Sequence, residues 1–388
     1  MGLFLFANGL ALDVSAEEAD GKLILPPNSP IRYYLPDDLF DPCRGFHRQT
    51  RVRMLSVTNQ IQADSMLKTK KDQSLTEAEI NQLITQRLQG SRPVAWEEDI
   101  SRNTLDTAPF ENLAAPNQLD PSQFKNRNRL EVIEPLLGER TIEQAIAADS
   151  YPIPCPDDRE GYSPGYDGVY WLSGLEDHLK IMDAARRHGV SPKTVFDFGC
   201  ASGRVVRHFA AQTDIPEIWG SDINGRHIRW LYEHLPHTVK PIFNHCIPSI
   251  PIPDKSVDII SAFSVFTHID TFETCWLAEL RRIMSDDGIA YLTVHNEDTW
   301  VAIRERIDDP ENRLIQSLLK IDPDFRQKLE QDLPDTKTVY RFSDSGPYRA
   351  QVFHSNNYLQ QVWGRFFKIE EILPLHHVRQ TVLVLRKS

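Results

Sequence analysis

Apolar and polar positions alternate in a regular way from about residue 166 to the end of the chain. The stretches "TVFDFG" (194–199), "EIWGSDI" (217–223) and "VDIISAFSV" (257–265) are continuous apolar runs of strand length. Such runs are typical of strands that are buried on both faces of a sheet. Between them, apolar residues recur at spacings of three and four, which predicts amphipathic helices in "GRVVRHFAAQ", "GRHIRWLYEHL" and "DTFETCWLAELRRIM".

The order of these segments predicts an α/β fold with a doubly wound, mostly parallel sheet. A helix at 170–189 precedes the first strand, and the helix that begins near 270 is expected to stop near Gly288. The last two apolar runs, 365–375 and 380–387, predict a hairpin that closes the same sheet with an antiparallel edge. The expected sheet therefore has seven strands and an antiparallel C-terminal strand.

Residues 1–165 follow a different pattern, rich in Pro, Asn, Asp and Gln and weak in periodicity. Helices are predicted at 74–90 and 141–149, and a basic stretch at 41–53 is interpreted as solvated or paired with acids. We therefore expect an N-terminal accessory region for substrate recognition at 1–165 and a second domain at 166–388. Within that domain, residues 297–350 form an irregular, helix-rich insert that is expected to act as a lid.

Composition narrows the classes of partner. The chain has 388 residues and a net charge of −12, so it lacks an overall field that attracts nucleic acid. Its five cysteines are scattered without CxxC spacing, which predicts reduced thiols in a cytoplasmic protein and no metal site. No window approaches the roughly 18–20 apolar residues of a membrane span, and the apolar N-terminus lacks the basic flank of a signal peptide.

The stretch "VFDFGCASGRVVRHF" (195–209) contains the turn after the first predicted strand and is typical of a ligand-binding site. Gly199, Ala201 and Gly203 stand two residues apart, between a strand and a helix. In a doubly wound sheet such a turn lets a ligand approach the backbone at the helix N-terminus. A dinucleotide turn would carry a third glycine where Arg204 stands, and this argues against NAD or FAD.

The stretch resembles the first motif, acid-x-Gly-x-Gly-x-Gly, of the class I S-adenosylmethionine-dependent methyltransferases, in their type 11/12-like branch. Asp197, Gly199 and Gly203 match that motif, and Ala201 replaces its middle glycine. Further along, "GSDIN", "FNHCIPSIPIPDKSVDII" and "SAFSVFTHID" resemble later motifs in the family's order. The resemblance covers roughly 166–388 apart from the insert and implies a Rossmann-like fold that binds S-adenosyl-L-methionine and releases S-adenosyl-L-homocysteine.

The resemblance also implies roles for individual residues. Asp197 would lie near the methionine ammonium, Asp222 would accept both ribose hydroxyls, and Asn244 and His245 would contact adenine. Two plainer alternatives stay open, since Asp222 also suits a helix cap and His245 suits an exposed surface. The full set expected to bind the cofactor is Asp197, Gly199, Ala201, Gly203, Asp222, Ile223, Asn244, His245 and Ser264.

Methyl transfer by in-line displacement requires alignment in a dry site and, for a hydroxyl or amine acceptor, a group that takes the proton. His268 and His295 follow the fourth and fifth strands and are the leading candidates, although His268 also suits a structural role. Other candidates from the same edge are Asp270, Glu297, Asp298, His376 and His377.

The identity of the acceptor is the least constrained part of the prediction. The C-terminal stretch from 353 to 375 resembles that of methyltransferases of bacterial sugar and secondary-metabolite pathways, which implies a hydroxyl of a small molecule or glycan. A peptide or protein N- or O-methyltransferase is an alternative, and so is a non-catalytic protein that binds S-adenosylmethionine or a partner. A homodimer is compatible with each of these alternatives.

Overall fold

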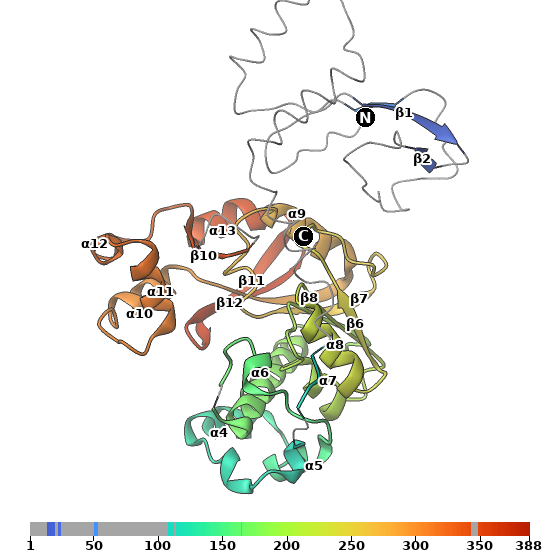
Figure 1. Ribbon diagram of the computed structural model, residues 1–388, viewed down its shortest axis with the longest axis vertical. Helices are drawn as coiled ribbons and strands as arrows, with labels where there is room; N and C mark the ends of the chain where they lie inside the picture. Colours follow the sequence, from blue (N-terminus) through green and yellow to red (C-terminus); the bar gives the residue numbers. More distant parts are fainter. Residues whose placement is uncertain are drawn as a thin grey trace, which may run out of the picture. The chain divides into compact units, whose positions relative to one another are not determined.

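The computed structural model describes residues 108–111, 114–163, 165–342 and 348–388, together with the backbone of three short strands near the N-terminus (Figure 1). The chain divides into two compact units, Met1–Gly90 and Ser91–Ser388. In the first unit, β1 pairs antiparallel with both of its neighbours in a sheet built from β1 (Val14–Ala19), β2 (Lys22–Ile24) and β3 (Thr50–Val52). The helix predicted at 74–90 and the side chains of the basic stretch lie outside the described residues.

The second unit is built on a seven-stranded sheet with the order β11-β12-β8-β7-β4-β5-β6. Its first five strands along the chain are parallel to one another, and β12 is antiparallel to both β8 and β11. The strands are β4 (Thr194–Phe198), β5 (Glu217–Asp222), β6 (Val239–Phe243), β7 (Val257–Ala262), β8 (Met284–Val294), β11 (Phe367–His377) and β12 (Gln380–Lys387). This arrangement confirms the predicted fold class.

The predicted hairpin and its antiparallel edge are confirmed. The C-terminal strand β12 pairs antiparallel with β8 on one side and with the edge strand β11 on the other, and β11 runs in the direction of the parallel strands. The burial of the two strands agrees with this order, because β12 is apolar and buried along its centre while β11 is largely half-exposed. One detail of the prediction is wrong, because Gly288 does not stop a helix: α9 ends at Ile283, and Gly288 lies inside β8.

Helices cover both faces of the sheet. On one face, Ile181, Phe209 and Trp230 pack against strand residues such as Val195, and on the other face Trp276 packs with the next strand residue, Phe196. Successive residues of a strand point to opposite faces, so a continuous apolar strand supplies both cores. The covering helices are α6 (Asp167–Arg187), α7 (Val206–Gln212) and α8 (Gly225–His234) on the first face, with α9 (Glu273–Ile283) and α13 (Asn356–Val362) on the second.

The insert has an aromatic core of its own. Trp300, Phe325, Tyr340 and Phe353 meet edge to face at centroid distances of 5.3–6.0 Å. Two strands, which the sequence pattern did not predict, form an antiparallel pair at its end, and His354 N–H at the end of that pair donates to the backbone carbonyl of His295. The elements are α10 (Glu297–Arg304), α11 (Arg313–Ile321), α12 (Phe325–Leu329), β9 (Lys337–Arg341) and β10 (Ala350–His354).

The segment before α6 packs on the sheet domain. Its α5 (Ile142–Ala148) confirms the helix predicted at 141–149, and Thr141 caps it by accepting a hydrogen bond from Gln144 N–H. Next to it, the buried carboxylate of Asp149 accepts hydrogen bonds from the Arg207 guanidinium and the Trp171 indole. The other short elements are η2 (Pro116–Gln118), η3 (Pro121–Phe124), α4 (Arg127–Ile133), η4 (Glu134–Leu136) and η5 (Pro156–Asp158). The recognition role expected of residues 1–165 stays a prediction.

A glycine on α6 allows that helix to approach the turn after β4. A Cβ added to Gly174 would lie 2.0 Å from the backbone oxygen of Arg204, whereas one added to Gly364 would have its nearest neighbour at 4.0 Å. We expect Gly174→Ala to lower the free energy of unfolding by about 1–3 kcal/mol or more in urea denaturation, because backbone has to shift. The control Gly364→Ala should stay within about 0.5 kcal/mol of the wild type, and equal effects of the two substitutions would contradict the prediction.

Candidate active site at the carboxyl edge of the sheet

The glycine turn follows β4 with three residues in the left-handed region. Gly199, Ala201 and Gly203 have φ values of 72°, 46° and 80°. At Gly199 only glycine fits, since an added Cβ would lie 2.3 Å from a methyl group of Val265. The turn is tied to the neighbouring strand, because the N–H groups of Gly199 and Cys200 donate to Ser221 O at 2.8 and 2.9 Å. Ala201 therefore keeps the backbone shape of the glycine that it replaces, at the cost of strain.

The carboxylate of Asp197 is buried where β4 ends. It accepts a hydrogen bond of 2.6 Å from the Ser261 hydroxyl on β7. Burial raises the pKa of Asp197 to about 7, against the opposing effects of that hydrogen bond and of the Arg204 charge. A cation that lay beside this carboxylate would favour its ionised form, so the group is poised to respond to a positively charged ligand.

Asp222 ends β5 and connects that strand to the glycine turn. One carboxylate oxygen accepts from Ala201 N–H at 2.9 Å, and the other accepts from Asn224 N–H at 2.8 Å. Asn224 itself caps α8, so Asp222 supports the start of that helix without being its cap. Burial raises the pKa of Asp222. Contact with a ribose stays a prediction for this residue.

The residues expected around adenine lie at the end of β6. Asn244 is buried, and its amide Nδ2 donates to His245 O at 3.0 Å, but its Oδ1 has no hydrogen-bond partner within the described residues. A buried acceptor of this kind suits the exocyclic amine of a purine. His245 is exposed and its ring lies 5.4 Å from that of Phe243, while Ile223 is half-buried.

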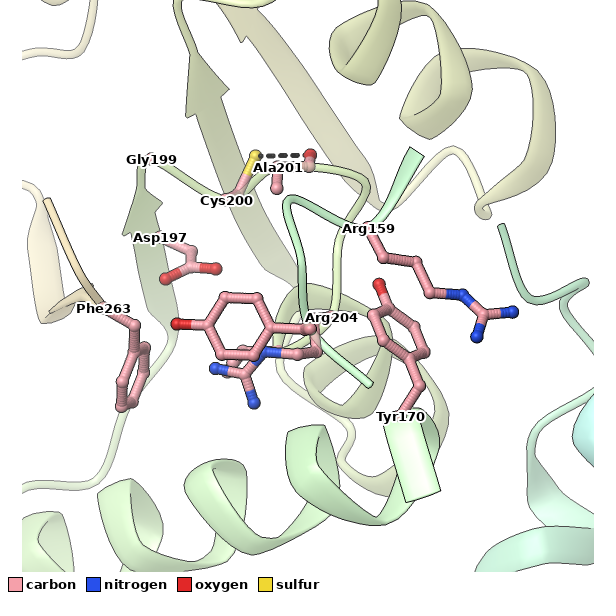
Figure 2. Close-up of a pocket in the computed structure, with 10 residues that line it drawn as sticks. Arg159, Tyr170, Asp197, Gly199, Cys200, Ala201, Arg204 and Phe263 are labelled. Atoms are coloured by element: carbon pink, nitrogen blue, oxygen red, sulfur yellow. Dashed lines mark hydrogen bonds between the residues drawn. The ribbon is translucent and has the colours of Figure 1, made fainter. Parts of the chain in front are cut away.

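A cavity of about 20 Å³ lies between the glycine turn and the segment that precedes α6. This volume is about that of one water molecule. Figure 2 shows Asp197 and Phe263 near one end and Tyr170 and Arg159 near the other, with Arg204 between them. The further lining residues are Tyr162, Gly199, Cys200, Ala201 and Val205. Thus three residues of the glycine turn and Asp197 share one cavity, as the sequence motif implies.

The covering segment, residues 155–163, makes several contacts with the glycine turn and its surroundings. The carboxylate of Asp158 accepts hydrogen bonds from the Arg226 guanidinium, and its backbone oxygen accepts one from the Ser202 hydroxyl in the glycine turn. The Tyr162 hydroxyl lies 2.9 Å from Ser264 Oγ, and the Arg204 guanidinium lies 4.2 Å from the centre of the Tyr162 ring. The chain's own side chains therefore fill most of the cleft.

His295 and His268, the predicted catalytic residues, both lie against the insert. Burial lowers the pKa of His295 to about 3, and its ring lies 5.1 Å from that of Phe353 on β10. The Nδ1 atom of His268 lies 2.7 Å from Ala350 O, and burial lowers its pKa as well. Neither residue is among those that line the cavity. Their catalytic role stays a prediction that this placement does not favour.

The structure brings together two groups that the motif analysis did not pair. Asp177 on α6 lies 2.9 Å from His377 Nδ1 and 2.6 Å from the Arg204 guanidinium, and all three are buried. Although burial opposes ionisation, the interactions of Asp177 with His377 and Arg204 outweigh it and hold the pKa of Asp177 well below its usual range. The sequence signal for this pair is limited to an acid at a buried position of α6, a helix that also buries the polar side chains of Ser173 and His178.

Residues 178–364 match a family model described as a methyltransferase domain. Over these residues the chain carries a methyltransferase domain, as its motifs predicted. The matched residues include five of the seven strands of the sheet, β4 to β8, together with the glycine turn and the insert described above. No curated protein matches the chain. None of the described helices is long and apolar enough to cross a membrane, and the same residues contain no cluster of three or more His, Cys, Asp or Glu that would hold a metal ion.

Several solved structures are similar to part of this chain at low sequence identity. The putative methyltransferase in complex with the Trm112 activator from Haloferax volcanii is 14% identical, with 55% of this chain and 92% of that chain covered and a TM-score of 0.37. The 1,6-didemethyltoxoflavin-N1-methyltransferase of Burkholderia thailandensis is 11% identical over 56% and 78%, with a TM-score of 0.37. A putative S-adenosylmethionine-dependent methyltransferase of Listeria monocytogenes is 14% identical over 56% and 98%, also with a TM-score of 0.37.

The strain at Ala201 gives a prediction with a definite sign. We expect Ala201→Gly to raise the free energy of unfolding by about 1 kcal/mol, because glycine adopts the left-handed conformation without the steric cost of a Cβ. Ala210→Gly in the helix α7 is the matched control and should lower it by about 0.5–1 kcal/mol. Urea denaturation of both variants measures the two changes, and a loss of stability in both would show that Ala201 is not strained.

Proposed function

We propose that this methyltransferase domain uses S-adenosylmethionine to methylate a hydroxyl group of a small molecule. The observation that carries the proposal is the sequence of polar groups at three neighbouring strand ends. Asp197, Asp222 and Asn244 end or follow β4, β5 and β6, which lie side by side in the sheet. In this order they suit an ammonium group, a pair of hydroxyls and an aromatic amine.

The residues present fit this cofactor. The buried Asp197 carboxylate would hold the methionine ammonium, Asp222 would accept from the ribose, and the unpartnered Oδ1 of Asn244 would accept from the adenine amine. When bound, S-adenosylmethionine supplies a methyl group on a positively charged sulfur. A site that encloses a ligand of this size has a volume of several hundred Å³, so we propose that the covering segment, residues 155–163, moves to admit it.

The enclosed position of the cavity supports a small acceptor over a polypeptide. The glycine turn is covered by the segment before α6, and the cavity is lined by the aromatic rings of Tyr162, Tyr170 and Phe263. We propose that the protein acts in the cytoplasm, in a biosynthetic pathway, in keeping with its acidic composition and scattered cysteines. Measurement of S-adenosylmethionine binding distinguishes this proposal from a protein that has the fold but does not bind the cofactor.

Calorimetric titration of the full chain with S-adenosylmethionine and S-adenosylhomocysteine should show micromolar binding of both. Asp222→Ala should weaken binding roughly 10- to 150-fold, or about 1.5–3 kcal/mol, because hydrogen bonds from the ribose to a charged group are lost. Asp287→Ala removes a fully exposed acid and should change the affinity by no more than about twofold. Absence of binding to the wild type would overturn the proposed function, and full affinity in Asp222→Ala would exclude the ribose contact.

The raised pKa of Asp197 predicts a pH dependence of cofactor binding. Below about pH 7 the carboxyl is mostly protonated in the free protein, whereas the methionine ammonium requires the carboxylate. Binding therefore releases a proton, and affinity should fall up to about tenfold for each pH unit from 7 towards 5. Calorimetry at about pH 6 in two buffers of different ionisation enthalpy measures the released proton. Asp197→Asn should bind more weakly at neutral pH and lose most of this dependence, since only Asp222 would then contribute.

A further inference from the structure

Four side chains from distant parts of the sequence form one continuous contact at the end of the cavity. The Tyr162 hydroxyl lies 2.9 Å from Ser264 Oγ and 3.3 Å from His377 Nε2. The opposite nitrogen of that imidazole, Nδ1, lies 2.9 Å from the carboxylate of Asp177. The residues come from the covering segment, the end of β7, the end of β11 and the middle of α6.

The position of Asp177 decides which nitrogen of His377 is free to accept a proton. A carboxylate only accepts hydrogen bonds, so Nδ1 of the neutral imidazole carries the hydrogen and Nε2 carries the lone pair. Asp177 and His377 are each only about 3–4% exposed, so the carboxylate holds the ring in place and would stabilise it once protonated. A base oriented by a second group is the arrangement that general-base catalysis requires.

The contacts of Tyr162 indicate which kind of chemical group fits beside His377. Its hydroxyl meets Nε2 and the Ser264 hydroxyl, while its ring lies 4.2 Å below the Arg204 guanidinium. The same ring lines the cavity with Asp197 and Gly199, where the methionine end of the cofactor is proposed to bind. The phenol of Tyr162 is therefore bound here through two contacts of its hydroxyl and through a cation over the face of its ring.

We propose that this position is the acceptor subsite, that it takes an aromatic hydroxyl in place of Tyr162, and that His377 is the catalytic base, with Asp177 as its positioning residue. The inference rests on the proposed methyltransferase function and names its substrate class. The acceptor oxygen forms the new bond to the methyl carbon as the carbon–sulfur bond breaks, and that electron pair stays on sulfur. The hydroxyl proton goes to Nε2 of His377, and from there to solvent after the product leaves.

Acidity favours an aromatic hydroxyl over that of a sugar. A phenol has a pKa of about 10 and imidazole one of about 6.5, so proton transfer between them is uphill by only a few units. An aliphatic hydroxyl is far less acidic and would gain much less from this base. The Arg204 charge, close to both the ring and Asp177, further stabilises a developing phenolate.

The test uses a pair of acceptors that differ in their need for a base. Full-length wild type, His377→Gln and His237→Gln are compared at about pH 8 with S-adenosylmethionine and either phenol or 4-nitrophenol, whose hydroxyl is already largely ionised there. His237 is an exposed histidine in the turn before β6 and lies outside the proposed machinery. His377→Gln should lose on the order of 10²-fold in turnover of phenol and retain turnover of 4-nitrophenol within roughly threefold, while His237→Gln should match the wild type with both.

A binding measurement accompanies turnover. In the complex with S-adenosylhomocysteine at about pH 6, wild type should shift bound 4-nitrophenol towards the phenolate absorption band, and His377→Gln should not. Equal loss of both acceptors in His377→Gln, unchanged turnover of phenol, or no turnover of any phenol by a wild type that binds S-adenosylhomocysteine would each overturn the inference. Failure of the wild type to bind S-adenosylhomocysteine would instead overturn the proposed function on which it rests.

Discussion

The buried ion pair between Arg204 and Asp177 is the interaction on which the arrangement of this site depends. It joins the first turn of the chain after β4 to the middle of α6, and through Asp177 it also reaches the hairpin between β11 and β12. Removing two charges from water is costly, and breaking such a pair by deleting one partner typically costs about 3–5 kcal/mol. Both charges of the pair also interact with other residues of the site: the Arg204 guanidinium lies over the Tyr162 ring, and the Asp177 carboxylate contacts the imidazole of His377.

The same turn is also fixed by close packing against α6 and by a hydrogen bond to the neighbouring strand. Gly174 lets α6 approach the backbone of Arg204, and the carboxylate of Asp222 receives the N–H of Ala201. Because the turn is held at both ends, its N–H groups and the Asp197 carboxylate keep a defined geometry without a ligand. A preorganised turn of this kind lowers the ordering cost of binding. It also explains how Ala201 is tolerated in a conformation that alanine rarely adopts.

Sequence patterns predict those parts of the molecule that are encoded locally. The strands, the helices and the glycine turn can be predicted from periodicity and spacing, and Asp222 can be placed because it ends the strand after the glycine turn. The order of the last two strands in the sheet cannot be predicted in this way, because it depends on which of them pairs with β8. Nor can the end of α9: a glycine usually stops a helix, but Gly288 is needed inside β8, where a Cβ would lie 2.9 Å from Asp258 O.

The sequence also does not indicate which histidine is the candidate base. His268, His295 and His377 all follow strands at the carboxyl edge, so position along the chain gives no reason to prefer one. What separates them is tertiary: β10 of the insert covers His268 and His295, whereas His377 meets an acid that lies 200 residues away in sequence. No periodic pattern predicts that contact, since an acid at a buried position of a helix does not indicate which distant residue it meets.

The covering segment gives a physical reason for keeping a phenol of the chain in the cleft. With Tyr162 in place, the cavity has room for about one water molecule, and the free electron pair of His377 is in contact with a hydroxyl. Replacement of that hydroxyl by a similar one from the acceptor would leave no buried polar group without a partner at any stage. An acceptor without a hydroxyl would leave the Ser264 hydroxyl and the His377 imidazole buried without a hydrogen-bond partner. The contacts that now close the site would therefore also disfavour binding of such an acceptor.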